Sequence, residues 1–281
     1  MQNGYRDLTE QDLSTIYTTT SPATNGPYAA DAGLVMLGAR GITGDARTFV
    51  YANIGGTGTV APGTLMVQAA APSNSTGLAI NTTTATTGAN TTAQLTLGSV
   101  TLWLTAAGTA FTQDQFAGGY MEVLQTSGSN NGPISYRIVG NTAPATTTGV
   151  FMVQLAQTDA LLNASVLVPG TDTVNLVYNP WWAVTTSTTS AFPAGLLRQQ
   201  SVGASGQYNF AWLQVTGPAL LQLDATSGGV TASGLLYQST TTAGDVAPAA
   251  PTLSHGTASA IAKARFTATA SSTVSAFLTV T

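Results

Sequence analysis

The feature that most constrains this chain is a series of seven short apolar segments between residues 47 and 180, each bounded by Gly, Pro, Asn or Ser. They are RTFVYANIGG, GTLMVQAAA, AQLTLGSVTLWLT, GGYMEVLQT, ISYRIVGN, GVFMVQLAQ and DTVNLVYNP. Short segments rich in β-branched and aromatic residues, separated by turn formers, are typical of β-strands. Because links such as GTDT after Pro169 are short, we expect antiparallel pairing in a barrel or a sandwich.

The composition supports an all-β protein. Thr occupies 49 positions and Gly 30, whereas charged residues make up only 6% of the chain. Threonine is β-branched and prefers extended backbone, and its hydroxyl covers a surface without ionic repulsion. An apolar content of 43% is sufficient for a hydrophobic core, so the chain is expected to be folded.

Shifts in composition predict four parts. Residues 1–47 carry eight of the eighteen charged residues and are expected to form an extended N-terminal arm with a short helix capped at Thr9. Residues 48–180 are expected to be the main β domain, and residues 181–251 a second, smaller β domain. Residues 252–281 are expected to add one or two strands, because apolar residues alternate there.

One stretch in the smaller domain, GQYNFAWLQVTGPALLQLD (206–224), has aromatic residues at alternate positions: Tyr208, Phe210 and Trp212. Alternate residues of a strand share a face. Gly217-Pro218 is typical of a turn, so the sequence predicts a β-hairpin here. Its aromatic face would lie in a core or against another chain.

The arm is a candidate interface with a neighbouring chain. Helical spacing places Leu13, Ile16 and Tyr17 on one face, and Arg6, Arg40 and Arg47 could pair with acidic groups of a partner. Deleting the arm is expected to weaken attachment and to leave the body folded.

The four tryptophans are expected in two kinds of place, a core or an interface. Trp103 and Trp212 are expected to be core residues. Trp181 and Trp182 would point to opposite sides of an extended segment, so at least one of them is a candidate interface residue.

Residues with catalytic or metal-binding chemistry are scarce. The only histidine, His255, has no neighbouring ligand, and the chain has no cysteine. Asp114 and Glu122 could act as a carboxylate pair, but they are better explained by a short turn. Neither LGARGITGDAR nor NIGGTGTVAPG has the pattern of a nucleotide-binding loop, and both are interpreted as loops. We therefore expect no enzymatic activity and no cofactor or metal.

Charge and hydropathy also bear on partners. With a net charge of −4 and seven scattered basic residues, the chain has no basic stripe for nucleic acid. No apolar run approaches the eighteen or so residues of a membrane span, and the first residues are not those of a secretory signal. We expect neither a nucleic-acid nor a membrane partner, and synthesis in a cytoplasm.

Several strand and turn phrases resemble capsid decoration proteins, also called cement or stabilisation proteins, of tailed bacteriophages. They are RTFVYANIGGTGTVAPGTLMVQAA, FAGGYMEV, ISYRIVGN, VNLVYNPW, YNFAWLQVTGPALLQLD and AGDVAPA, within about Thr48 to Ala250. The resemblance implies a Gly/Thr-rich β fold on the outer surface of an icosahedral head, often trimeric, that bridges major capsid subunits. It transfers no individual binding residue.

The expected function is therefore that of a non-enzymatic structural virion protein, with the major capsid protein and further copies of itself, as a homotrimer, as partners. The alternative is a glycan-binding module on a phage or bacterial surface, because aromatic side chains on β-structure can stack on sugars.

Overall fold

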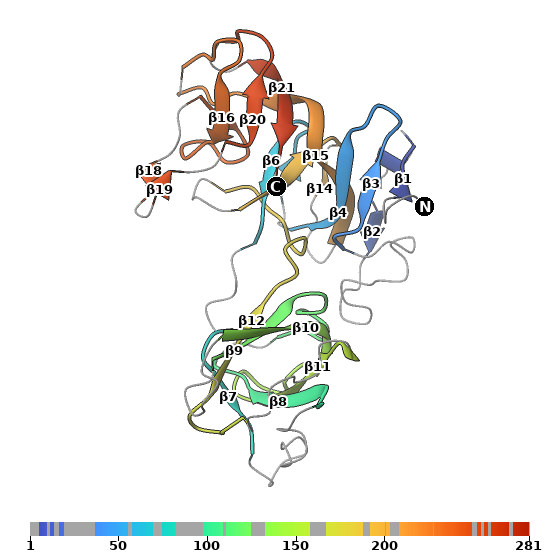
Figure 1. Cartoon of the computed structure of the whole chain (residues 1–281), viewed down its shortest axis with the longest axis vertical. Coiled ribbons are helices and arrows are strands. Elements are labelled where there is room, and N and C mark those ends of the chain that lie inside the picture. The colour runs from blue at the N-terminus through green and yellow to red at the C-terminus, as the bar shows by residue number, and fades with distance from the viewer. Residues whose placement is uncertain are drawn as a thin grey trace. The chain divides into compact units, whose positions relative to one another are not determined.

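The computed structural model describes the chain in segments that together cover most of it. These are residues 6–9, 12–13, 17–19, 37–55, 58–69, 75–82, 98–108, 111–124, 133–157, 167–187, 192–199, 201–202, 208–226, 228–248, 252–253, 256–257, 260–269 and 272–280. Almost all regular structure in them is strand, so the all-β prediction is confirmed (Figure 1). The chain divides into two compact units.

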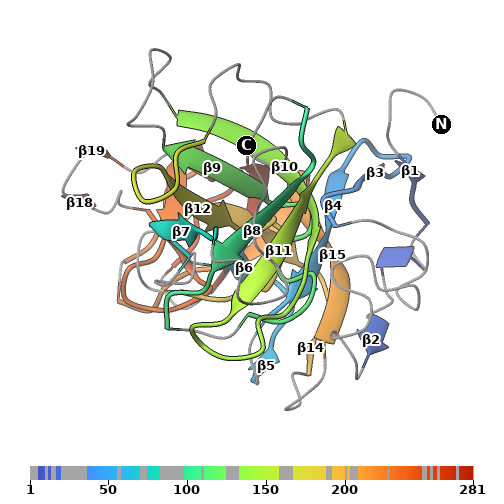
Figure 2. The same ribbon diagram turned by 90° about the horizontal axis from the view of Figure 1, so that it is seen from below.

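The barrel unit is formed mainly by Ala70–Asn179. Six strands close in the order β10-β11-β8-β7-β12-β9, and each pairs antiparallel with its neighbours (Figure 2). The strands are β7 (Leu78–Ile80), β8 (Thr101–Thr105), β9 (Tyr120–Leu124), β10 (Pro133–Asn141), β11 (Val150–Leu155) and β12 (Thr173–Val177). Closure leaves no unpaired edge around the barrel, which decides between the barrel and the sandwich that the sequence left open.

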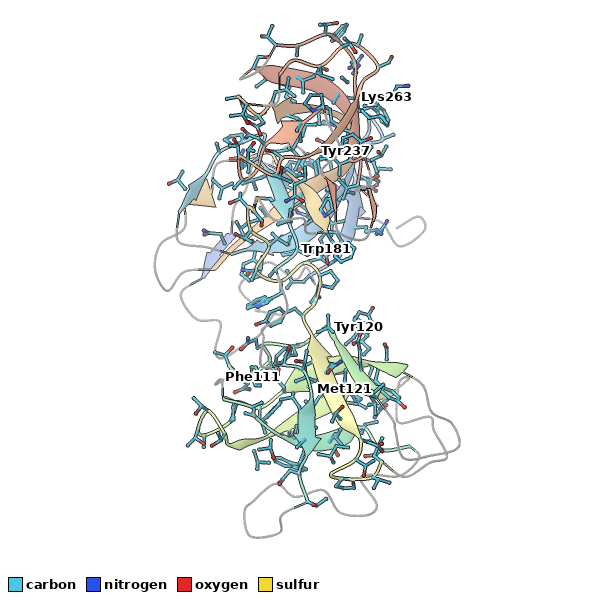
Figure 3. All side chains as sticks on the ribbon, turned by 90° about the vertical axis from the view of Figure 1, so that its left-hand side faces the viewer. Phe111, Tyr120, Met121, Trp181, Tyr237 and Lys263 are labelled. Atoms are coloured by element: carbon cyan, nitrogen blue, oxygen red, sulfur yellow. The ribbon has the colours of Figure 1, made fainter. Side chains whose placement is uncertain are left out.

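The barrel encloses its own hydrophobic core. Alternate residues of β8 and β12 are buried, as a strand with one inward face requires. Met121 and Phe111 lie within this unit in Figure 3, and the Phe111 ring contacts Phe116 and Phe151 with centroids 5.0 and 5.4 Å apart. Trp103 is not part of this core: it lies between the inward residues Leu102 and Leu104 and is half-buried on the outer side, so its core assignment was wrong.

The sheet unit combines Met1–Ser21, Ala30–Ala69 and Pro180–Thr281. Its main sheet has the order β1-β3-β4-β15-β21-β20-β16-β17, with β2 and β13 also paired to β15 and with β6 paired to β13. The strands are β1 (Arg6–Asp7), β2 (Tyr17–Thr19), β3 (Arg40–Ile42), β4 (Thr48–Ile54), β6 (Leu65–Val67), β13 (Pro193–Leu197), β15 (Tyr208–Gln222), β16 (Leu235–Gln238), β17 (Val246–Ala247), β20 (Ala262–Ala264) and β21 (Thr273–Thr279). Two strand pairs lie outside it: β5 (Thr59–Val60) with β14 (Ser201–Val202), and β18 (Thr252–Leu253) with β19 (Gly256–Thr257).

This arrangement corrects the predicted domain boundaries. Residues 48–69 do not belong with the barrel, because β4 pairs along β15, more than 150 residues later in the chain. Residues 252–281 complete the same sheet as residues 181–251, as predicted, since β21 pairs with β15 and β20 with β16. The composition shows where the character of the sequence changes, but it does not show which distant strands pair.

The predicted separation of an arm from a body also needs correction for the described residues. Strand β3 pairs antiparallel with β4, and Leu37 is buried. Strand β3 also falls within LGARGITGDAR, which was interpreted as a loop. Leu8 and Leu13 are buried as well, and a side chain at Gly41 would collide with Leu8. Residues of the predicted arm therefore contribute to the fold.

The predicted helix cap is present at Thr9. Its hydroxyl accepts a hydrogen bond from the Asp12 backbone N–H at 3.2 Å, and its own N–H donates to Asp12 Oδ2 at 2.9 Å. Reciprocal bonding of this kind is a capping box. Asp12 and Leu13 are helical, while the residues on either side of them lie outside the described part of the chain.

The predicted hairpin at 206–224 is a single long strand, β15. Its first half pairs with β4, and its second half pairs with β21 from Thr216 to Gln222. Gly217 lies at the transition with φ of +96°, and its missing side chain leaves room for Arg47, whose Cγ would lie 2.8 Å from a Cβ there. Pairing with β4 ends at Thr216, after a bulge between Gln214 and Thr216, and Gly217-Pro218 lies within the continuous pairing with β21 and not in a turn.

Candidate interaction surface

The described residues among those predicted to form an interface differ in exposure and in their partners. Leu13 is buried, and Arg40 is exposed on β3. Arg47 donates from Nε to Asp45 Oδ2 at 2.6 Å. The side chains of Arg6, Ile16 and Tyr17 lie outside the described residues, so their role stays a prediction.

Trp181 and Trp182 belong to a segment that packs against β4. Trp182 is buried, and half-buried Trp181 packs against the core residues of the sheet unit. The side chain of buried Asn53 fixes the segment: its Oδ1 accepts from the Ala183 N–H at 3.2 Å and its Nδ2 donates to Asn209 O at 3.2 Å. The pair therefore holds this chain's own fold together and does not present an exposed aromatic surface.

The aromatic face of β15 is also internal. Phe210 and Trp212 are buried, and the ring of Tyr51 on β4 lies 6.0 and 5.2 Å from theirs. Tyr51 is the direct cross-strand neighbour of Trp212, which explains the contact. Burial of Trp212 confirms its assignment to the core. None of the four tryptophans is well exposed, so they do not offer a stacking surface for a sugar.

A row of four exposed residues, three of them apolar, crosses four strands of the sheet unit. Pro218 on β15 pairs with Phe277 on β21, Phe277 with Lys263 on β20, and Lys263 with Leu235 on β16. These four residues are all exposed, and Phe277 and Leu235 are 50% and 48% exposed. Neighbouring strands lie about 4.8 Å apart, so the row spans about 15 Å. Leu220, two residues beyond Pro218, extends it and is 62% exposed.

We name this surface the C-terminal sheet face and define it by Pro218, Leu220, Leu235, Lys263, Arg265 and Phe277. Its opposite side is the core: Val274, Ala276 and Leu278 of β21 are buried. Alternation along β21 therefore separates a packed side from an exposed side that carries a large aromatic ring. Large apolar side chains clustered on a sheet surface are typical of a protein interaction site.

The charge of this face is opposite to that of the whole chain. Lys263, at the surface of the unit in Figure 3, and Arg265 are the only charged residues after Asp245 in the sequence. The Arg265 guanidinium lies 5.8 Å from the ring centroid of Phe266. A face with two cations, on a chain of net charge −4, favours an acidic partner surface.

A search for catalytic chemistry in the described residues finds no cluster of three or more metal-ligating side chains. Asp114 belongs to a tight turn, where its Oδ1 accepts from the Asn141 N–H at 3.2 Å, while Glu122 lies on β9. This agrees with the turn interpretation of Asp114. His255 lies outside the described residues. Within the described segments, no helix has the length and apolarity to cross a bilayer.

One buried carboxylate, Asp224, is held by hydroxyl groups. Its Oδ1 accepts from the backbone N–H and the hydroxyl of Thr226, at 2.8 and 2.9 Å, and its Oδ2 accepts from the hydroxyls of Ser239 and Thr241. The hydroxyl of Ser239, then that of Thr241, lowers the pKa of Asp224 well below its ordinary value. All these partners donate hydrogen bonds to a charged acceptor, so the arrangement joins loops of the fold.

Comparison with known proteins gives no relative: no family model, no curated protein and no solved structure matches the chain. The C-terminal sheet face was not among the predicted site residues. Alternation of Ser275, Phe277 and Thr279 in the sequence was a signal for its central strand. The row itself depends on which strands pair, and local sequence does not give that.

Proposed function

We propose that this protein is a non-enzymatic structural protein of a virion, which binds the outer surface of an icosahedral phage head and stabilises contacts between major capsid subunits. The observation that supports this most is the C-terminal sheet face, an exposed apolar row with two cations and no acidic residue. The strand and turn phrases that resemble decoration proteins support the same function.

An exposed apolar face of this kind is suited to holding neighbouring subunits of a shell together. Packaged double-stranded DNA presses outward on a head, and a protein that spans a subunit boundary adds interface area that must be lost before the shell opens. Each contact can be modest because many copies act on one shell. The low charge and acidic balance of the chain suit an outer surface that does not bind nucleic acid. We place the protein on the virion exterior after assembly in the host cytoplasm.

The test is co-sedimentation of the purified protein with undecorated heads, comparing the wild type with Phe277→Glu. A glutamate at the centre of the row introduces a charge into an apolar contact, and loss of a central aromatic anchor of about 2 kcal/mol weakens binding roughly 30-fold. Phe192→Glu is the matched control, since Phe192 is also an exposed phenylalanine of the sheet unit but lies outside the face. It should bind like the wild type.

Two results would count against this proposal in different ways. If the wild type fails to bind heads at micromolar concentration, the virion function is refuted. If both variants bind equally, the virion function stands but the C-terminal sheet face is not the contact. Sedimentation of the free protein over the same concentration range tests the homotrimer, and a monomer throughout would exclude a preformed trimer.

A further inference from the structure

A hollow of about 470 Å³ adjoins the C-terminal sheet face. One of its walls belongs to that face: Leu220 on β15 is the cross-strand neighbour of Ser275 on β21, and both line the hollow. Pro218 is a lining residue too, and its cross-strand neighbour is Phe277. Because alternate residues of a strand share a face, Ser275 lies on the same side of β21 as Phe277. The hollow is therefore continuous with the exposed apolar row.

The other walls come from two segments of the same sheet unit. Pro62 and Gly63 belong to the link between β5 and β6, while Leu197 and Arg198 lie at the end of β13. The Gly63 N–H donates to Leu197 O at 2.8 Å, which ties these two segments to each other. Walls that are hydrogen-bonded within the fold give a hollow that is formed before a partner binds.

The largest polar side chains of the lining already have partners within the chain. Gln214 Nε2 donates to two backbone carbonyls of β15, at 3.1 and 2.8 Å. Arg47 donates to Asp45, and the guanidinium carbon of Arg198 lies 6.0 Å from the ring centroid of Phe49. The described lining residues include no carboxylate that would attract a cation. An occupant of the hollow therefore does not need to supply a charge.

The exposed surface around the hollow is apolar. Leu220 is 62% exposed, Pro62 and Pro218 are exposed, and Phe277 beside them is 50% exposed. When a partner covers this face, a hollow left empty would lose packing contacts on all of its walls. An aromatic ring supplies a large apolar area in one side chain, and aromatic anchors buried in pockets carry much of the binding energy of many interfaces.

We propose that this hollow receives one aromatic side chain of the capsid subunit that binds the C-terminal sheet face. The inference rests on the proposed function and adds an anchor point to it. Leu220 belongs to both surfaces, so it would contact the inserted ring on one side and the covering partner surface on the other. The partner is thereby specified further: its contact surface carries a protruding aromatic residue.

The first test needs no capsid. The full chain, labelled with ¹⁵N, is titrated with N-acetyl-phenylalaninamide as the probe and with N-acetyl-alaninamide as its control. We expect the phenylalanine amide to shift the backbone amide signals of Leu220 and Ser275 with a Kd of about 1 mM, an affinity ordinary for a ligand of this size. The alanine amide should leave these signals in place because it has no ring.

Three variants connect the hollow with head binding. Ser275→Phe fills the hollow from a surface position of β21, where a strand accepts an aromatic residue. It should abolish the shifts caused by the probe and weaken co-sedimentation with undecorated heads about 30-fold. Ser275→Ala keeps the hollow open and should resemble the wild type in both assays. Thr279→Phe adds a ring on the same face of β21 outside the lining, and it should bind the probe normally.

Other results would overturn the inference. Absence of shifts at Leu220 and Ser275 with about 10 mM probe, or equal shifts with the alanine amide, would show that the hollow does not bind an aromatic ring. Equal binding of heads by the wild type and Ser275→Phe would show that the hollow is not an anchor. Failure of the wild type to bind heads would refute the proposed function and with it the identity of the partner. The probe titration of the wild type decides the aromatic specificity even if Ser275→Phe does not fold.

Discussion

Replacing Asp224 with alanine tests how this low-charge chain uses its few buried ionised groups. In the wild type, both carboxylate oxygens accept hydrogen bonds, and the side chain is almost completely buried. The hydroxyls can partly bond to one another after the change, because Thr226 Oγ1 and Thr241 Oγ1 are 2.9 Å apart. The Thr226 backbone N–H cannot turn, so it loses its acceptor.

The expected loss follows from that inventory. A hydrogen bond to a charged group contributes about 1.5–3 kcal/mol, and the hydroxyls add a smaller amount because they relax. We expect Asp224→Ala to lower the free energy of unfolding by about 3 kcal/mol. For a unit of this size that corresponds to a fall in Tm of roughly 6–12 °C, measured by calorimetry at pH 7.

Acid titration gives an independent check with a definite sign. Since the folded pKa of Asp224 is lowered, its contribution is complete above the ordinary aspartate pKa and is lost as pH falls through the folded value. The wild type should therefore lose stability below about pH 4 more steeply than Asp224→Ala. Identical slopes, or a loss at pH 7 below about 0.5 kcal/mol, would refute the role assigned to this carboxylate.

Asp245→Asn is the matched control. Desolvation by burial, and secondarily the charge of Asp224, raises the pKa of Asp245. The sign is opposite: ionised Asp245 destabilises the fold above its raised pKa, and that penalty is relieved as pH falls toward the ordinary value. The Asn variant should be as stable as the wild type at pH 7 or slightly more stable. A large loss of stability in this variant would show that Asp245 contributes to the fold in a way that its unfavourable charge does not explain.

Two further predictions concern the barrel unit and its controls. Gly119→Ala should destabilise the barrel by about 2 kcal/mol, because the new Cβ would lie 2.1 Å from Val177 O. Gly44→Ala, in the sheet unit, meets no atom within 4 Å and should be neutral in the same melting assay. Residues 70–179 expressed alone should melt cooperatively by circular dichroism, because the barrel closes and buries a core within those residues, and a gradual melt would show that folding needs the sheet unit.

The local fold was predictable from the sequence, but its long-range organisation was not. Alternation and turn residues predicted five of the six barrel strands and β21, because a strand's inward face must be apolar wherever it packs. The short strand β7 (Leu78–Ile80) was not predicted. The pairing of Val50 with Leu213 joins segments that no local pattern links. Domain boundaries depend on such pairs, so composition placed residues 48–69 in the wrong unit.

The candidate interaction surface was also only partly predictable, because it depends on pairing between distant strands. Leu13 and Trp182 are apolar and are predicted from the sequence as interface residues, yet both are buried within the chain. Hydrophobicity alone does not distinguish a residue that packs on its own fold from one that packs on a partner. Phe277 is distinguished only by alternation against the buried Ala276 and Leu278 and by its neighbours on the adjoining strands.

Gly217-Pro218 shows why the predicted hairpin did not form. In a hairpin these residues would reverse the chain, but here glycine accepts a φ of +96° beside Arg47 and the strand continues. Pro218 has no N–H, and its carbonyl accepts from Gln214 Nε2 at 2.8 Å, so this position needs no strand partner on the side where pairing with β4 ends at Thr216. The strand continues past it because β21 pairs with β15 from Thr216 to Gln222. The distant pairing with β21, and not the local turn preference of Gly-Pro, therefore decides the conformation of this segment.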